Sequence, residues 1–112
     1  MNIANLAQDE DFKILAFTAI DLWGAASQLR MLSEECAELI VAQNHLERGR
    51  INFTSLMEEL ADVEIMLAQI RVLYQDEAGY LAIKSKKLSR LGSRVDTALA
   101  LVKNCTNPRE CA

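Results

Sequence analysis

The sequence contains very few of the residues that interrupt helices. Its 112 residues include one proline and four glycines. Sandwich and α/β domains need many turns, and turns are rich in glycine, proline and asparagine, so this shortage argues against both classes. Hydrophobic residues make up 51% of the chain and charged residues 25%, which is typical of a globular protein rather than a disordered one. The composition predicts one all-α domain built from a few long helices.

Other features are missing as well. The three cysteines, Cys36, Cys105 and Cys111, form no CxxC pair, which argues against a zinc site or a disulfide framework. The first twenty residues lack a positively charged start, and no uncharged apolar run approaches the ~20 residues that cross a bilayer. The net charge of −4 disfavours a nucleic-acid binder. We therefore expect a cytoplasmic protein with reduced thiols and neither a membrane nor a nucleic-acid partner.

Four helices are predicted, separated by glycines at positions 24, 49 and 79. They span residues 9–22, 25–47, 54–75 and 80–103. For the third helix, Thr54 or Ser55 is the expected N-cap, with Glu58 or Glu59 placed to complete a capping box. Residues 1–103 are thus expected to form the single domain, and residues 104–112 a flexible tail.

The last three predicted helices each carry an apolar stripe at helical spacing. The stripes consist of Leu29, Leu32, Cys36, Leu39 and Leu46; of Leu56, Leu60, Val63, Leu67 and Ile70; and of Leu81, Leu88, Leu91, Val95, Leu99 and Val102. A 23-residue helix is about 35 Å long, which is large for so short a chain. We therefore expect a flat, open bundle of four or five helices whose uncovered apolar faces are completed by homo-oligomerisation.

The acidic residues are arranged in two matching pairs. Glu35 and Glu38 flank the apolar stripe of the second helix, and Glu59 and Asp62 hold the same relation to the stripe of the third. If these helices pack together, four carboxylates converge. Glu34 points further outward, as a supporting residue or as surface charge. The alternative for each pair alone is a solvated helix face.

Converging carboxylates repel one another and lose hydration, so some would take up protons unless a cation were bound. Mg²⁺, or Mn²⁺, suits a site made only of oxygen ligands. The single histidine, His45, does not stand three residues after any glutamate, so the histidines of a di-iron bundle are missing. Zinc would require histidine or cysteine ligands.

The order Glu34-Glu35-Cys36-Ala37-Glu38, a loop with Arg48-Gly49-Arg50, then Glu59-Leu60-Ala61-Asp62 resembles the MazG-like all-α nucleoside triphosphate pyrophosphohydrolases. The resemblance covers about two thirds of the chain, from Leu22 to Val95, and is greatest to the short single-domain type. It implies a Mg²⁺-dependent, house-cleaning hydrolase that converts (d)NTPs to the monophosphate and pyrophosphate. It also implies Glu35, Glu38, Glu59 and Asp62 as metal ligands, and a dimer or a dimer of dimers.

Further residues are candidates for binding the substrate. Lys87, Arg90 and Arg94 form a narrow basic stripe on the fourth helix, with Lys84 nearer the apolar sector. A triphosphate needs cations besides the metal, and similar family members place basic residues of this helix near the phosphates. The alternative is a solvated basic face with lysine stems lying on the core.

Two uncharged residues complete the candidate site. Gln28 shares the sector of Glu35 and could contact a base or ribose, or form a hydrogen bond across the bundle. Trp23 could stack on a base, or pack in a core or interface.

Two other functions stay open. The same acidic motif serves related enzymes on other nucleotides, such as phosphoribosyl-ATP. A non-enzymatic helical interaction module would use the carboxylates only as surface charge.

Overall fold

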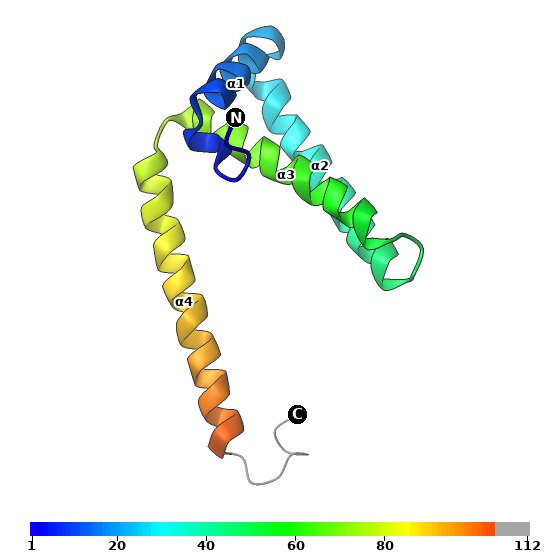
Figure 1. Ribbon diagram of the computed structural model, residues 1–112, viewed down its shortest axis with the longest axis vertical. Coiled ribbons are helices and arrows are strands. Elements are labelled where there is room, and N and C mark those ends of the chain that lie inside the picture. The colour runs from blue at the N-terminus through cyan, green and yellow to red at the C-terminus, as the bar shows by residue number, and fades with distance from the viewer. Residues whose placement is uncertain (105–112) are drawn as a thin grey trace. The chain divides into compact units, whose positions relative to one another are not determined.

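The computed structural model describes residues 1–104, and these contain helices and connections but no strand. The elements are the 3-10 helix η1 (Leu6–Gln8), α1 (Glu10–Trp23), α2 (Ala25–Glu47), α3 (Phe53–Tyr74) and α4 (Glu77–Asn104) (Figure 1). The prediction of an all-α chain is confirmed. The expected tail, apart from Asn104, lies outside the described residues, and so do Cys105 and Cys111.

Capping explains where α1 begins and ends. The Asp9 carboxylate accepts hydrogen bonds from the backbone N–H groups of Asn2 (2.7 Å) and Phe12 (3.0 Å). These bonds lower the pKa of Asp9 below its ordinary value of 3.8. The helix stops at Gly24, whose φ of 86° is unfavourable for any residue with a side chain. The sequence therefore predicted both ends of α1 to within one residue.

The cap of α3 differs from the prediction. Asn52, rather than Thr54 or Ser55, is the N-cap, and its side-chain oxygen accepts from the backbone N–H of Ser55 at 3.0 Å. Asparagine is as strong a cap as serine, so the helix begins as soon as the loop after Gly49 permits. The expected capping box with Glu58 or Glu59 is wrong for the same reason.

The start of α4 also differs. The connection between α3 and α4 consists of Gln75 and Asp76, where Gln75 adopts a left-handed conformation with φ of 53°. Gly79 was expected to separate the helices but lies within the first turn of α4. A single glycine with helical neighbours lowers helix stability by about 1 kcal/mol without necessarily ending the helix.

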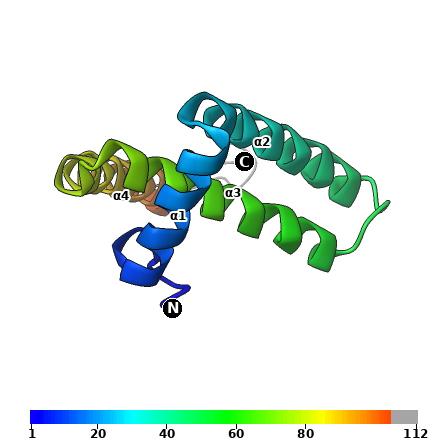
Figure 2. The ribbon, with the colours of Figure 1, turned by 90° about the horizontal axis from the view of Figure 1, so that it is seen from above.

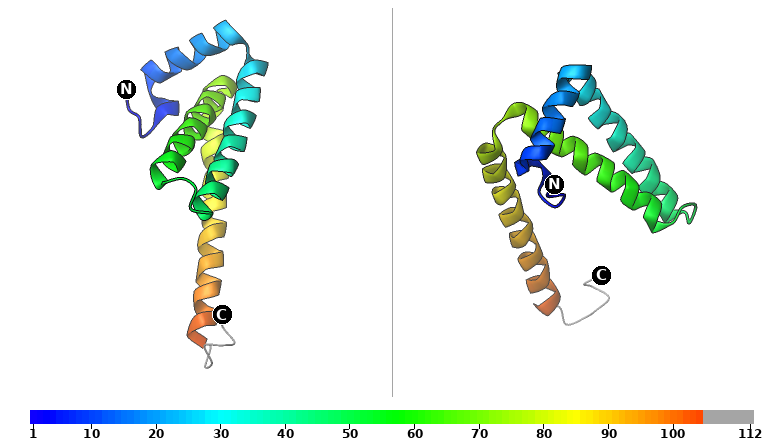
Figure 3. Two further views of the ribbon diagram at one scale, coloured as in Figure 1. Left: turned by 90° about the vertical axis from the view of Figure 1, so that its right-hand side faces the viewer. Right: turned by 45° about the horizontal axis from the view of Figure 1, so that its top comes forward.

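The chain divides into two compact units, Met1–Asp76 and a second that starts at Glu77. In the first, α2 and α3 form an antiparallel hairpin closed by the loop of residues 48–52 (Figure 2). Helix α1 lies across the open end of this hairpin, where α2 starts and α3 ends (Figure 3). A small apolar core lies between η1, α1 and the second half of α3, and it consists of Ala7, Phe12, Ala16, Ala68 and Val72, with Leu6 packed against it.

The hairpin does not close on the faces that periodicity predicted. Every member of the apolar stripes of α2 and α3 is only half-buried or exposed, and Leu29, Leu60 and Leu67 are exposed. The buried residues of α2 are Gln28 and Ala42, and those of α3 include Met66 and Gln69. The helices thus meet along the adjacent face, which carries the carboxylates, and leave apolar surface uncovered as expected.

Helix α4 is a separate element of 28 residues with no buried residue. Its predicted apolar stripe, from Leu81 to Val102, is exposed throughout. Among the described residues, no helix has both the length and the apolar character that a membrane span requires.

Candidate functional site

The seam between α2 and α3 is unusually polar. Near its open end, the Gln69 amide nitrogen donates to the Gln28 side-chain oxygen at 2.9 Å, and both residues are buried, with 8% of the surface of Gln69 and 5% of that of Gln28 exposed. Because the helices run antiparallel, moving two turns along α2 and two turns back along α3 leads from this pair to Glu35 and Asp62. The hydrogen bond therefore belongs to the register that brings the two acidic motifs to the same level, and helps to set it.

Three of the four predicted carboxylates come together at this level. Glu35 and Glu38 from α2 and Glu59 from α3 each offer one carboxylate oxygen, and these three oxygens all lie within 4.8 Å of one another. Glu35 and Glu59 are half-buried, whereas Glu38 is exposed. We call these three residues the acidic cluster.

Two members of the acidic cluster have raised pKa values because they are desolvated and lie near other negative charges. Desolvation raises the pKa of Glu35 above its ordinary 4.5, and the negative charges of Glu38 and Asp62 raise it further. Desolvation is also the largest cause of the raised pKa of Glu59, followed by the negative charges of Glu38, Asp62 and Glu58. Oxygen Oε2 of each of these two residues is shielded from solvent and accepts no hydrogen bond. Buried oxygens of this kind are costly without a partner.

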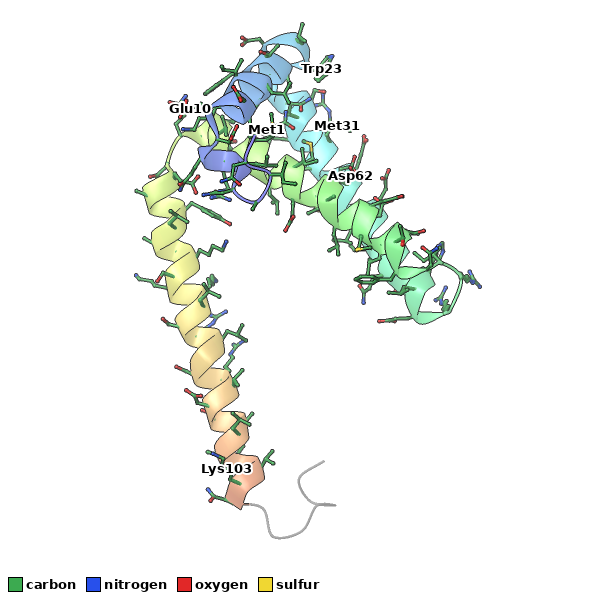
Figure 4. All side chains as sticks on the ribbon, viewed as in Figure 1. Met1, Glu10, Trp23, Met31, Asp62 and Lys103 are labelled. Atoms are coloured by element: carbon green, nitrogen blue, oxygen red, sulfur yellow. The ribbon has the colours of Figure 1, made fainter. Side chains whose placement is uncertain are left out.

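The remaining predicted acids lie around the cluster. Asp62 is exposed and stands about midway along α3 (Figure 4), close enough for its charge to raise both pKa values but outside the 4.8 Å group. Glu34 is exposed on α2, as its outward angle predicted. Only three of the four expected ligands therefore have carboxylate oxygens close enough to one another to bind the same cation.

The donor set of the cluster fits a hard divalent cation. It consists of carboxylate oxygens alone, and oxygens bound to one Mg²⁺ are about 3–4 Å apart, slightly less than the spread here. A divalent cation would neutralise the mutual repulsion and occupy the two unpaired oxygens. Neither zinc nor iron has the nitrogen or sulfur ligands that it prefers at this point of the seam.

Gln28 and Trp23 lie away from the cluster. The amide of Gln28 forms the hydrogen bond across the bundle that was one of its two expected roles. Trp23, which is labelled in Figure 4, is the last residue of α1, and 64% of its surface is exposed. About 15 Å of α2 separates the start of that helix from Glu35, so the structure does not bring Trp23 into the acidic cluster.

The basic candidates all lie on α4 and are exposed. Lys84 holds its ammonium nitrogen 5.9 Å from the ring centre of Tyr80, one turn earlier, a cation–π contact within the helix. Lys87, Arg90 and Arg94 belong to the same unit as this pair, which is separate from the unit that holds the acidic cluster.

Sequence reasoning missed a pocket beside the cluster. It lies between the second half of α2 and the first half of α3 and has a volume of about 510 Å³. Its lining comprises Ala37, Glu38, Val41, Ala42, His45, Ile51, Ser55, Glu58 and Glu59. The sequence feature that could have indicated this pocket is the pair of small residues Ala42 and Ser55. They occupy facing positions between α2 and α3, whereas the long side chains of Gln28 and Gln69 face each other nearer the open end.

Comparisons with protein-family models, with curated proteins and with solved structures find no match to this chain. The fold and the candidate site together describe an all-helical protein whose α2–α3 hairpin carries an acidic cluster that could hold a cation.

Proposed function

We propose that the protein is a MazG-like, Mg²⁺-dependent nucleoside triphosphate pyrophosphohydrolase that releases pyrophosphate from (d)NTPs. The observation that carries this proposal is the pair of unpaired, solvent-shielded oxygens of Glu35 and Glu59, next to Glu38. If these glutamates served only as surface charge, their carboxylates would be hydrated and would keep their ordinary pKa values. The order of the acidic residues along two consecutive helices supports the family assignment.

Glu35, Glu38 and Glu59 would hold the cation, and Asp62, whose charge acts on both Glu35 and Glu59, is the candidate for a fourth ligand. When bound, Mg²⁺ supplies charge neutralisation for the phosphate oxygens and activates water. In the reaction, a water oxygen attacks the α-phosphorus, and the bond from that phosphorus to the bridging oxygen breaks. A carboxylate of the cluster, or Glu34, would orient this water and accept its proton.

The proposal includes a homo-oligomer, a dimer or a dimer of dimers. Residues 1–76 carry five basic and thirteen acidic side chains, a net charge of −8, whereas α4 carries six basic and two acidic, a net charge of +4. Both units also expose large apolar side chains. A second copy would cover such surfaces with complementary charge. Lys87 and Arg90 are then the best candidates for contacting substrate phosphates. Analytical ultracentrifugation tests the assembly directly.

The activity is tested by incubating the protein with Mg²⁺ and a panel of (d)NTPs plus phosphoribosyl-ATP, and by identifying the released product. We expect pyrophosphate, and we expect Glu38→Gln to reduce its release by at least about a hundredfold because the cation loses a charged ligand. Glu64→Gln is the matched control, since Glu64 is an exposed acid of α3 outside the cluster.

Other outcomes separate the alternatives. Release from phosphoribosyl-ATP alone identifies the related enzyme class. Release of orthophosphate contradicts the proposal. If no substrate reacts and no divalent cation binds, the carboxylates are surface charge of an interaction module.

A further inference from the structure

The pocket beside the acidic cluster has an origin in the packing of the hairpin. At the level of Gln28 and Gln69, two long side chains fill the seam. Closer to the loop, the facing positions hold Ala42, which is buried, and Ser55. Short side chains at facing positions leave the helices separated by a hollow that no neighbouring residue fills. The hollow of about 510 Å³ is in the size range of small-molecule sites.

The walls of the pocket differ from one end to the other. Ala37, Val41, Ala42 and Ile51 make most of its surface apolar. Three acidic residues, Glu38, Glu58 and Glu59, also line the pocket, and two of them, Glu38 and Glu59, belong to the cluster. Phosphate groups are repelled from such a lining unless a cation stands between them. The pocket therefore suits a neutral, largely apolar group attached to something held at the carboxylates.

We propose that this pocket receives the nucleobase of the nucleotide, a neutral planar heteroaromatic ring, while the phosphates stay at the acidic cluster. The inference rests on the proposed function, because the phosphates and their cation account for the anchoring at Glu38 and Glu59. Glu38 and Glu59 belong to the pocket lining as well as to the cluster, so one ligand can span the two without leaving the seam.

Ser55 and His45 provide the polar contacts of the pocket. The Ser55 hydroxyl donates its proton to the Asn52 side-chain oxygen at 3.2 Å. Its lone pairs therefore remain available, and the hydroxyl acts as an acceptor toward the pocket. An N–H group on the edge of the base is the matching donor. The His45 ring, on α2, offers a flat surface and a ring nitrogen at the loop end.

Filling the pocket provides the first test. Val41 and Ile40 are neighbouring aliphatic residues of α2, 51% and 58% exposed, but only Val41 lines the pocket. We expect Val41→Trp to raise the KM for the best (d)NTP about tenfold at nearly unchanged kcat, and Ile40→Trp to leave both parameters near wild type. Equal effects of the two variants would overturn the proposal.

A second test needs no catalysis. Nucleosides without phosphate are titrated into metal-free, isotope-labelled wild-type protein, and backbone amide shifts are followed by NMR. We expect shifts centred on Ala37, Val41 and Ser55 that disappear in Val41→Trp and persist in Ile40→Trp. Absence of these shifts for all common nucleosides overturns the pocket assignment.

The two tests also separate this inference from the proposed function. Pyrophosphate release without nucleoside shifts, and without a KM effect of Val41→Trp, refutes the pocket and leaves the enzyme intact. Nucleoside shifts without any pyrophosphate release refute the enzyme, and the pocket stands as a nucleoside-binding site.

Discussion

Divalent cations should stabilise the folded protein, and they should do so through the acidic cluster. A ligand that binds only the folded state adds about 2.7 kcal/mol to the free energy of unfolding when its concentration is about a hundred times its Kd. For a unit of the size of residues 1–76, each kcal/mol raises the melting temperature by about 4–8 °C. Saturating Mg²⁺ or Mn²⁺ should therefore raise the melting temperature by about 10–20 °C.

The perturbation that tests the origin of this shift is Glu59→Gln. In the wild type, the Glu59 carboxylate is desolvated and lies next to the negative charges of Glu38 and Asp62, which is why its pKa is raised. Replacing it by a neutral amide of the same shape relieves this repulsion. The metal-free variant should melt at a higher temperature than the metal-free wild type, yet gain little from added cation.

Circular dichroism at increasing temperature measures both effects, with the metal removed by a chelator and then restored. Glu64→Gln, which neutralises an exposed acid on the same helix, should behave like the wild type in both conditions. If neither cation changes the wild-type melting temperature at millimolar concentration, the acidic cluster is not a cation site. If the shift survives Glu59→Gln intact, the cation binds elsewhere.

Three further predictions concern stability. In metal-free protein, the free energy of unfolding should rise as the pH falls from neutrality toward 4.5, the ordinary glutamate pKa, because the raised pKa values of Glu35 and Glu59 make the folded state bind protons before the unfolded chain does. Urea titrations across this pH range measure the effect, and the dependence of the free energy of unfolding on pH should become weaker in the Glu35→Gln, Glu59→Gln double variant. Gln69→Ala should lower the free energy of unfolding by about 1–3 kcal/mol in urea, since it leaves the buried Gln28 oxygen unpaired, whereas Gln43→Ala on the exposed side of α2 should cost less than about 0.5 kcal/mol. Asn52→Ala should cost about 1 kcal/mol through loss of the α3 cap, and Thr54→Ala should not; the reverse order would restore the cap that the sequence alone suggested.

Local signals predicted most of the secondary structure correctly. The break at Gly24 and the loop at Gly49 were found because a positive φ depends on one residue and its immediate neighbours. The errors, at Asn52 and Gly79, arose where two local signals competed within a few residues. Cap choice then depends on where the preceding loop ends, which is set by packing of the hairpin.

The buried face of the hairpin was beyond local reasoning. Helical periodicity identified the apolar stripe of α2, with Leu32, Cys36 and Leu39, as the surface that a helix tends to bury. In the structure the hairpin closes beside that stripe, through Gln28, Ala42, Met66 and Gln69. Which face meets which is a choice among several packings, and it depends on residues more than forty positions apart.

Local signals in the sequence were sufficient to predict a helical chain, the positions of most of its helices, and carboxylates at matching angles on two of them. Each of these properties depends on residues within a few turns of one another. The selection of Glu35, Glu38 and Glu59 as one cluster, without Asp62, and the pocket between Ala42 and Ser55 became known only from the packing of the helices. Those features depend on the antiparallel register of α2 against α3, which the buried contact of Gln28 with Gln69 helps to set.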